Sequence, residues 1–531
     1  MRKTVSSSIT IFLALSALFL TGGTFGVYSA NAQSVNTGFE EIHITADGSI
    51  IPSTAPIQRN GDIYTLTADI VSAFGANGII VERNNIILDG AGHKLESEGC
   101  HDRSARKIYH TVGIDLTNDS NVTIVDAEIN LFYDSIVLSG SSRNKILDNI
   151  INVNQDGEHG IDLRSNSEQN SISGNKIVSP HSCISINSST NNAIVENDLT
   201  GDFILQNSHY NKIFQNDIKA NARGIALQAS HDNTLRDNIF SIYALDISGN
   251  SISDFVNDVD SSNQYAGKPI YYWVDVHDQK VPSDAAYVCL VSCSGITIEN
   301  IRYEFSGPRI LLVNTTNSLI AKNYAKGTDL YFLNLTYSNN NRIIENFINT
   351  NMVGIFLTHS LQNFIAENNL VNNSMGAVLV YSSQNTISYN NVSANSINGI
   401  SNGLSFENSS ENTIFNNSIV SNYGYGIKLT SSSGNKFYHN AFINNNPQVA
   451  SFNSTNLWDD GPVSGGNYWS DLADDESVYV IDANNQDNYP LNNFGKQYVF
   501  PIETILVLLL VAVVASSTLI YFTVVKRKRS T

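Results

Sequence analysis

Two aspartates, a histidine and an arginine occur where a strand-like pattern, Gly-Ile-x-Leu, repeats in the first third of the chain. The third position is Asp115 in one copy and Asp162 in a later copy, and His159 and Arg164 flank the later copy. In stacked strands this position points outward, which places the two carboxylates two coils, or roughly 9.6 Å, apart. We take these four residues as candidate catalytic groups.

Two kinds of polysaccharide chemistry fit this arrangement. Inverting glycosidases hold their carboxylates about 6.5 to 9.5 Å apart, so the predicted spacing barely permits acid/base hydrolysis. A calcium-dependent lyase needs several acids on adjacent coils and a basic residue that abstracts a proton, for which Arg164 is the nearest candidate. The alternative is that these side chains only form a solvated polar face.

Aromatic residues are concentrated in a second stretch, residues 265–282. Tyr271, Tyr272 and Trp273 stand together there and are followed by Asp275. Such rings combine a flat apolar face with a polar tip, which suits stacking on sugars. These four residues are therefore candidate carbohydrate-binding groups. The alternative is that the rings pack this insertion onto the coils.

Two further stretches mix acids with other ionisable residues. The loop 96–110 contains Cys100, His101 and His110 and interrupts the first coils, as an active-site loop on a rigid scaffold would. A solvated surface loop is the alternative. The acids from Asp459 to Asp482 could hold Ca²⁺, but they lack the spacing of an EF-hand loop. No metal ligands are therefore assigned.

All of these stretches are positioned by a sequence motif that repeats along the chain, N-x-I-x-x-N-x-I, in which I stands for any bulky apolar residue. We call this motif the coil phrase. Its first asparagines are Asn144, Asn170, Asn192, Asn211, Asn233, Asn341, Asn363, Asn385, Asn412 and Asn435. Apart from the interruption between Asn233 and Asn341, their separation of 19 to 27 residues is typical of solenoids. We interpret the asparagine as the residue that adopts left-handed φ/ψ at each bend and that forms a hydrogen-bonded ladder between coils.

The repeat also predicts the strands. Apolar residues two apart, as in Gly-Ile-x-Leu, point to one face of a strand, so each repeat holds three short strands separated by turns. This describes one coil of a parallel β-helix. A leucine-rich repeat has a similar period, but its leucine-rich consensus is missing here.

Composition and charge narrow the choice of partners. The formal net charge is -19 and the pI is about 4.9. A phosphate backbone would be repelled, so nucleic acid is not expected as a partner. Cys100, Cys183, Cys289 and Cys293 are scattered, and we expect buried thiols.

Both ends of the chain carry membrane signals. Arg2 and Lys3 precede an apolar run, and the small residues Ala30 and Ala32 complete a secretory signal peptide. The apolar run 505–525 is long enough to span a membrane and is followed by four basic residues. These features predict a single-pass protein with an extracellular N-terminal part and a cytoplasmic tail.

The expected organisation follows from these features. It comprises a signal peptide (1–32), N-terminal cap strands (33–80), parallel β-helix repeats (81–457, with the aromatic insertion at 239–295), a C-terminal cap and stalk (458–498), a transmembrane helix (499–525) and a basic tail (526–531).

Three features together resemble a known family: the coil phrase, the Tyr-Tyr-Trp-x-Asp-Val insertion beginning at Tyr271, and the Gly-Gly-Asn-Tyr-Trp-Ser-Asp motif at 465–471. They are similar to the NosD-type right-handed parallel β-helix family, and more closely to its archaeal cell-surface, membrane-anchored members. The resemblance implies a pectate-lyase-like fold, and copper supply to nitrous oxide reductase for the name-giving members. This chain has only three methionines and four scattered cysteines, so soft ligands for copper are scarce.

Two functional hypotheses remain. The first is a membrane-anchored surface β-helix without enzymatic activity that binds a polysaccharide or surface glycan, or that acts in adhesion or the cell envelope. The second is a polysaccharide lyase or glycoside hydrolase that uses the carboxylates of the early coils.

Overall fold

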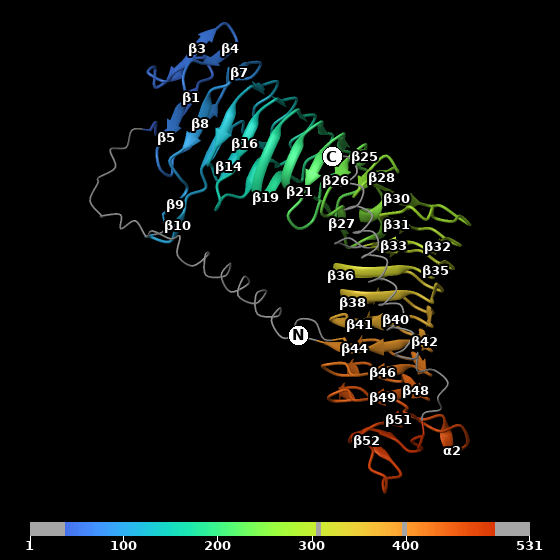
Figure 1. Ribbon diagram of the computed structural model, residues 1–531. Coiled ribbons are helices and arrows are strands. Elements are labelled where there is room, and N and C mark those ends of the chain that lie inside the picture. Colours follow the sequence, from blue (N-terminus) through green and yellow to red (C-terminus); the bar gives the residue numbers. More distant parts are fainter. Residues whose placement is uncertain (1–37, 103, 304–308, 396–400, 494–531) are drawn as a thin grey trace, which may run out of the picture. The chain divides into compact units, whose positions relative to one another are not determined.

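The computed structural model describes residues 38–102, 104–303, 309–395 and 401–493. Within these ranges the chain is an all-β solenoid of the right-handed type with about 17 turns, which confirms the β-helix part of the predicted fold class (Figure 1). The only helical segments of the described residues are η1 (Ile252–Phe255) and α2 (Gly461–Ser464). None of the helices in these ranges is long and apolar enough to cross a membrane. The predicted signal peptide and transmembrane helix lie outside the described residues.

Each regular coil contains three strand segments that stack on the equivalent segments of the next coil. In one coil these are β15 (Lys145–Leu147), β16 (Ile150–Asn152) and β17 (His159–Arg164). Their central isoleucines are fully buried and pair in register with isoleucines of the following coil. Alternate side chains therefore point into one continuous core, as the apolar spacing predicts.

The first segment of each coil forms two separate sheets, which are parallel except for the antiparallel pair of β3 with β4 at the N-terminal end. The ten-stranded sheet contains β3 (Ile57–Asn60), β4 (Ile63–Leu66), β7 (Ile87–Asp89), β12 (Thr123–Val125), β15, β18 (Ser171–Ser173), β20 (Ala193–Val195), β22 (Lys212–Phe214), β25 (Thr234–Arg236) and β28 (Asp258–Val259). The seven-stranded sheet contains β32 (Thr297–Glu299), β35 (Leu319–Ala321), β37 (Arg342–Ile344), β39 (Phe364–Ala366), β42 (Thr386–Ser388), β45 (Thr413–Phe415) and β48 (Lys436–Tyr438).

The second and third segments of the coils belong to one long sheet, because several strands run through both positions. Its first part contains β1 (Ile42–Ile44), β2 (Ile50–Ile51), β5 (Ile70–Ser72), β6 (Ile79–Val81), β8 (Lys94–Ser97), β11 (Val112–Asp115), β13 (Glu128–Asn130), β14 (Asp134–Ser139), β16, β17, β19 (Lys176–Asn187), β21 (Asp198–Gln206), β23 (Asp217–Lys219), β24 (Ile225–Gln228), β26 (Ile239–Phe240), β27 (Leu245–Ser248) and β29 (Gln264–Tyr265). Its second part contains β30 (Lys268–Val274), β31 (Tyr287–Val291), β33 (Arg302–Tyr303), β34 (Ile310–Val313), β36 (Tyr324–Thr336), β38 (Phe347–Thr358), β40 (Asn369–Val371), β41 (Met375–Val380), β43 (Asn391–Ser393), β44 (Asn402–Glu407), β46 (Ser418–Val420), β47 (Ile427–Thr430), β49 (Ala441–Ile443), β50 (Val449–Phe452) and β51 (Tyr468–Trp469). Two short hairpins lie apart from this sheet, β9 (His101–Asp102) with β10 (Lys107–Ile108), and β52 (Tyr479–Asp482) with β53 (Asn485–Asp487).

The predicted asparagine ladder is present, and its members are buried. The backbone N–H and the side-chain amide of Asn170 both donate to Oδ1 of Asn192, at 2.9 and 3.0 Å, and the same pattern recurs coil after coil. The amide also donates to Ser141 O in the preceding coil at 3.0 Å. A parallel ladder of serines runs beside it, as where Ser167 N donates to Ser189 Oγ at 3.1 Å. These ladders satisfy the polar groups that the turns bury.

The other role assigned to the asparagine, left-handed φ/ψ at the bend, is wrong. The described residues with positive φ include Gln169, Gln362 and Glu367, each of which stands immediately before a ladder asparagine. The first asparagine of each phrase does not have positive φ. Its side chain points inward to the ladder, so the preceding residue makes the bend.

All three parallel strand rows stop at the same level of the solenoid. The rows end at β27, β28 and β29 and resume at β30, β32 and β33. Among the residues that the structure describes, the only strand pairing between the two stacks is the short antiparallel contact of β29 with β30. β31 has a hydrophobic core on each face: Cys289 and Val291 pack in the core of the first stack, and Val288 and Leu290 in that of the second. We call this region, residues 252–291, the joint.

The C-terminal end of the core is closed by aromatic rings. Trp469 stacks on Phe442, with ring centroids 4.3 Å apart, and on Tyr479, at 3.9 Å. Asp487 fixes this arrangement, since it accepts hydrogen bonds from the Trp469 indole at 2.9 Å and from Asn467 N at 2.7 Å. The closing motif noted in the sequence thus seals the last coil.

Candidate functional site

The outer face of the early coils carries aligned ionisable side chains. In the register of the third strand row, Asp134 of β14 pairs with His159 of β17, and Asp115 and Asp162 both pair with Val137, from opposite sides. Asp115 and Asp162 therefore lie two coils apart, as predicted. The side chain of Asp162 is buried rather than exposed, at 4% of its accessible area.

Two hydrogen-bonded pairs of ionisable side chains connect neighbouring coils here. His159 Nδ1 lies 2.9 Å from Asp134 Oδ1, and the hydroxyl of Tyr133 donates to Glu158 Oε2 at 2.8 Å. The members of each pair are 25 residues apart, so each pair bridges one coil. A histidine held at Nδ1 by a carboxylate is the arrangement that positions an imidazole for general acid–base chemistry.

The environment of His159 favours its protonated form. Burial lowers the pKa of this imidazole, but the hydrogen bond to Asp134 and the charges of Asp162 and Glu158 outweigh that effect and raise it overall. Burial raises the pKa of Asp162, against the opposing charges of His159 and Arg164. The guanidinium of Arg164 lies 3.3 Å from Asp162 Oδ2. The early coils thus hold an imidazole and a carboxyl whose pKa values are both raised.

The loop singled out in the sequence joins this cluster. It forms the hairpin β9–β10, and His101 Nδ1 lies 2.9 Å from Asp156 Oδ2, next to Glu158. The ring of His110 meets the ring of Tyr133 edge to face at 4.3 Å. We call Tyr133, Asp134, Glu158, His159 and Asp162, with Arg164 and His101, the early-coil cluster.

Of the four predicted catalytic residues, the structure brings three together and leaves one apart. His159, Asp162 and Arg164 belong to the early-coil cluster, whereas Oδ1 of Asp115 accepts hydrogen bonds from Thr117 in its own turn. The sequence places Asp134 on a preceding coil near these residues but gives it no catalytic role, and it does not single out Tyr133. Aligning successive coils in register would have found the pairing of Asp134 with His159, and Tyr133 precedes Asp134 directly.

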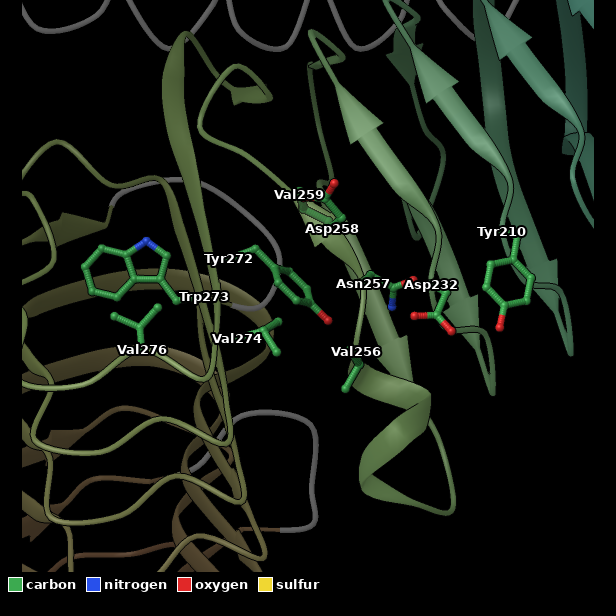
Figure 2. Close-up of a pocket in the computed structure, with 10 residues that line it drawn as sticks. All are labelled: Tyr210, Asp232, Val256, Asn257, Asp258, Val259, Tyr272, Trp273, Val274 and Val276. Carbon is green, nitrogen blue, oxygen red and sulfur yellow. The ribbon is translucent and has the colours of Figure 1, made fainter.

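The joint contains an open cavity of about 630 Å³. We call it the joint cleft. It is lined by Tyr210, Asp232, Val256, Asn257, Asp258, Val259, Tyr272, Trp273, Val274 and Val276. Figure 2 shows Tyr210 and Asp232 toward one end of the lining and Trp273 and Val276 toward the other, with Tyr272 between them. The cleft opens where the first strand row is interrupted after β28, so the break in the repeat creates it.

The predicted carbohydrate-binding residues have different surroundings. Tyr272 is 5% exposed and its hydroxyl donates to Phe255 O, so this ring mainly packs the joint. Trp273 is half-buried and meets Tyr271 edge to face at 6.2 Å. The hydroxyl of Tyr271 donates to Asp284 Oδ1 at 3.0 Å. Asp275 is largely exposed, 3.4 Å from His277 Nε2, and does not line the cleft.

A comparison with protein families identifies the fold's relatives. The family model described as periplasmic copper-binding protein (NosD) matches residues 43–204, 246–400 and 385–473, which is more than half of the chain. The chain belongs to the NosD family. A search of curated proteins finds no match.

Distant likenesses to solved structures concern the fold alone. They include a DFA-IIIase from Arthrobacter chlorophenolicus A6 in complex with GF2, with 12% identity over 50% of this chain and 66% of that chain and a TM-score of 0.30. The periplasmic alginate epimerase AlgG has 12% identity over 81% and 83%, with a TM-score of 0.27. The Dettilon tailspike protein has 14% identity over 68% and 60%, with a TM-score of 0.21. This chain thus spans about two thirds of the length of the DFA-IIIase.

The copper in the family's description finds no suitable ligand set among the described residues. No group of three or more His, Cys, Asp or Glu side chains there is placed to hold a metal ion. The four cysteines are buried free thiols, as expected, and those of Cys183 and Cys293 donate to backbone carbonyls. Met352 is exposed on the surface. These residues do not fit a copper site.

Proposed function

We propose that this protein is a cell-surface β-helix that binds glycans in the joint cleft and is held to the membrane by its C-terminal apolar segment. The observation that carries the proposal is the cleft itself, in which Tyr210, Tyr272 and Trp273 stand with Asn257 and two aspartates. Binding sites favour junctions between structural units, and aromatic rings with a few polar groups suit sugars. The secretory signal and the basic tail support the extracellular placement.

The proposal is tested by screening the full-length protein on a glycan array and measuring the affinity of the best ligand. Replacing Trp273 by Ala is expected to weaken binding roughly three- to tenfold, because an aromatic contact contributes about 0.5–1.5 kcal/mol. Trp273→Phe should retain most of the affinity. The matched control is Tyr423→Ala, which removes an aromatic ring that is 72% exposed in the second stack.

Unfolding curves separate a binding defect from a folding defect, since Trp273 also packs against the second core. Loss of affinity with an unchanged unfolding midpoint supports the cleft. A wild-type protein that binds no glycan on the array, or a Trp273→Ala variant that binds like the wild type, contradicts the proposal.

A second candidate function is polysaccharide cleavage by a lyase or glycoside hydrolase. The observation that favours it is the pairing of His159 with Asp134 beside Tyr133 and Glu158. If the early-coil cluster is catalytic, His159→Ala should lower cleavage by about 10²- to 10⁴-fold, the usual contribution of a general acid–base group. His359→Ala in the second stack is the control.

The products distinguish the two reactions. An unsaturated sugar indicates a lyase, and a new reducing end without unsaturation indicates a hydrolase. If a polysaccharide panel gives neither product with the wild type, this second function is rejected while glycan binding stands.

A further inference from the structure

The joint cleft has an unbalanced charge. Two of its lining residues, Asp232 and Asp258, are acidic, and no Lys, Arg or His is among the ten residues that line it. The chain as a whole carries a formal charge of -19, so the surrounding field is also negative. An anionic sugar such as a uronate would be repelled here, and a cationic group would be attracted.

The two aspartates differ in how far their charge is already neutralised. Asp258 Oδ2 lies 2.6 Å from a guanidinium nitrogen of Arg236, which forms a second ion pair with Asp260. Asp232 Oδ2 instead lies 2.8 Å from Nδ1 of His231. The partner of Asp258 is thus a permanent cation, whereas the partner of Asp232 is an imidazole, which can donate a hydrogen bond in its neutral form as well.

The histidine beside Asp232 belongs to a stacked pair of imidazoles. His231 stacks on His209 with ring centroids 3.8 Å apart, and its backbone N–H donates to His209 Nδ1 at 3.1 Å. Burial, followed by the charge of His231, lowers the pKa of His209. The partner of Asp232 is therefore an imidazole within a stacked pair, in contrast to the guanidinium that partners Asp258.

Aromatic rings complete an environment suited to an amine. Tyr210, Tyr272 and Trp273 line the same cleft as Asp232, and the faces of such rings attract cations. We propose that the joint cleft selects glycans that carry a protonated primary amine, that is, amino sugars without an N-acetyl group. This inference rests on the proposed glycan-binding function and adds the chemical class of the ligand.

A matched pair of ligands tests the inference. Glucosamine oligomers and N-acetylglucosamine oligomers of the same length differ only in that the amine is free or acetylated. The full-length protein is expected to bind the free-amine oligomer about three- to tenfold more tightly. The difference should shrink as salt is added, because salt screens an exposed charge contact.

Charge variants locate the effect. Asp232→Asn should abolish the preference for the free amine, so that the two oligomers bind the variant with equal affinity. Asp475→Asn removes the same formal charge from an exposed position near the C-terminal end and should leave the preference intact. An equal loss in both variants would assign the preference to the overall charge of the chain and overturn the inference.

The outcomes also separate this inference from the function on which it rests. Equal affinity for the two oligomers, or binding of the acetylated one alone, overturns the amine preference and leaves glycan binding in place. If neither oligomer binds but other glycans on the array do, the amine preference is likewise overturned and glycan binding again stays in place. If no glycan binds, both proposals fail.

Discussion

At the scale of single residues, two neighbouring positions of the coil phrase have different roles. The asparagine forms the ladder, and the residue before it makes the bend. The ladder could be predicted because the same asparagine recurs at every coil and its amide can both donate and accept. The bend could not be assigned, because the residue with positive φ varies in type: it is Arg143 in one coil, Gln169 in the next and Tyr210 further on. A position with no preferred residue type leaves no pattern in the sequence.

One residue breaks the serine ladder with a charge. Asp119 occupies the place that Ser141 holds one coil later, since Ser120 and Ser142 are paired. Its side chain is 5% exposed, and its Oδ2 has no hydrogen-bond partner among the described residues. Burial, followed by the charges of Asp115 and Glu82, raises the pKa of Asp119 to about 7.

This shift predicts a pH-dependent loss of stability that Asp119→Asn removes. Well below pH 3.8 the carboxyl is protonated in both states. As the pH rises through 3.8, the unfolded chain ionises first, and the folded state loses relative stability up to about pH 7. The wild type should lose roughly 2–4 kcal/mol against the variant across that interval, as measured by denaturant unfolding at a series of pH values. Parallel curves for the two proteins would contradict the assignment.

At the scale of elements, each ladder residue holds three coils together. Asn368 is 1% exposed, donates through its backbone N–H and its amide to Asn390 Oδ1, and also donates to Ile343 O at 2.8 Å. Its own Oδ1 accepts two hydrogen bonds from Asn346, at 3.0 and 2.9 Å. The strands form the repeating coils, and these hydrogen bonds fix the alignment of each coil on its two neighbours.

Replacing Asn368 by Ala should therefore cost more than an ordinary surface change. The substitution removes the acceptor of the buried Asn346 backbone N–H and the hydrogen bonds that the side-chain amide of Asn368 donates to Asn390 and Ile343. A buried group left unsatisfied costs about 1–3 kcal/mol and each lost hydrogen bond about 1 kcal/mol, so we expect a loss of roughly 3–5 kcal/mol in the free energy of unfolding. Asn369→Ala is the control, because its amide oxygen accepts one hydrogen bond, from Asn391 on the outer face. Equal losses in the two variants would show that the ladder is not the source of the stability.

At the scale of the whole molecule, the repeat predicts the scaffold well and the sites poorly. The β-helix, its coil period and the interruption at the aromatic insertion follow from spacing alone. The pairing of His101 with Asp156 does not, because the direction in which a loop folds over the coils is not recorded in a periodic pattern. The packing of β31 against two different cores could not be predicted either. A fully buried strand has the same apolar sequence whether its two faces contact one core or two.

The interruption of all three strand rows at the joint has a consequence for cooperativity. In a solenoid, order passes from coil to coil through nearest-neighbour contacts, so unfolding that starts at one end spreads along the stack. At the joint the hydrogen-bonded rows do not continue, and the two stacks are coupled mainly by side chains that pack on both faces of β31. The joint is thus a boundary between two cooperative units, and a glycan bound across the cleft would strengthen their coupling without touching a ladder.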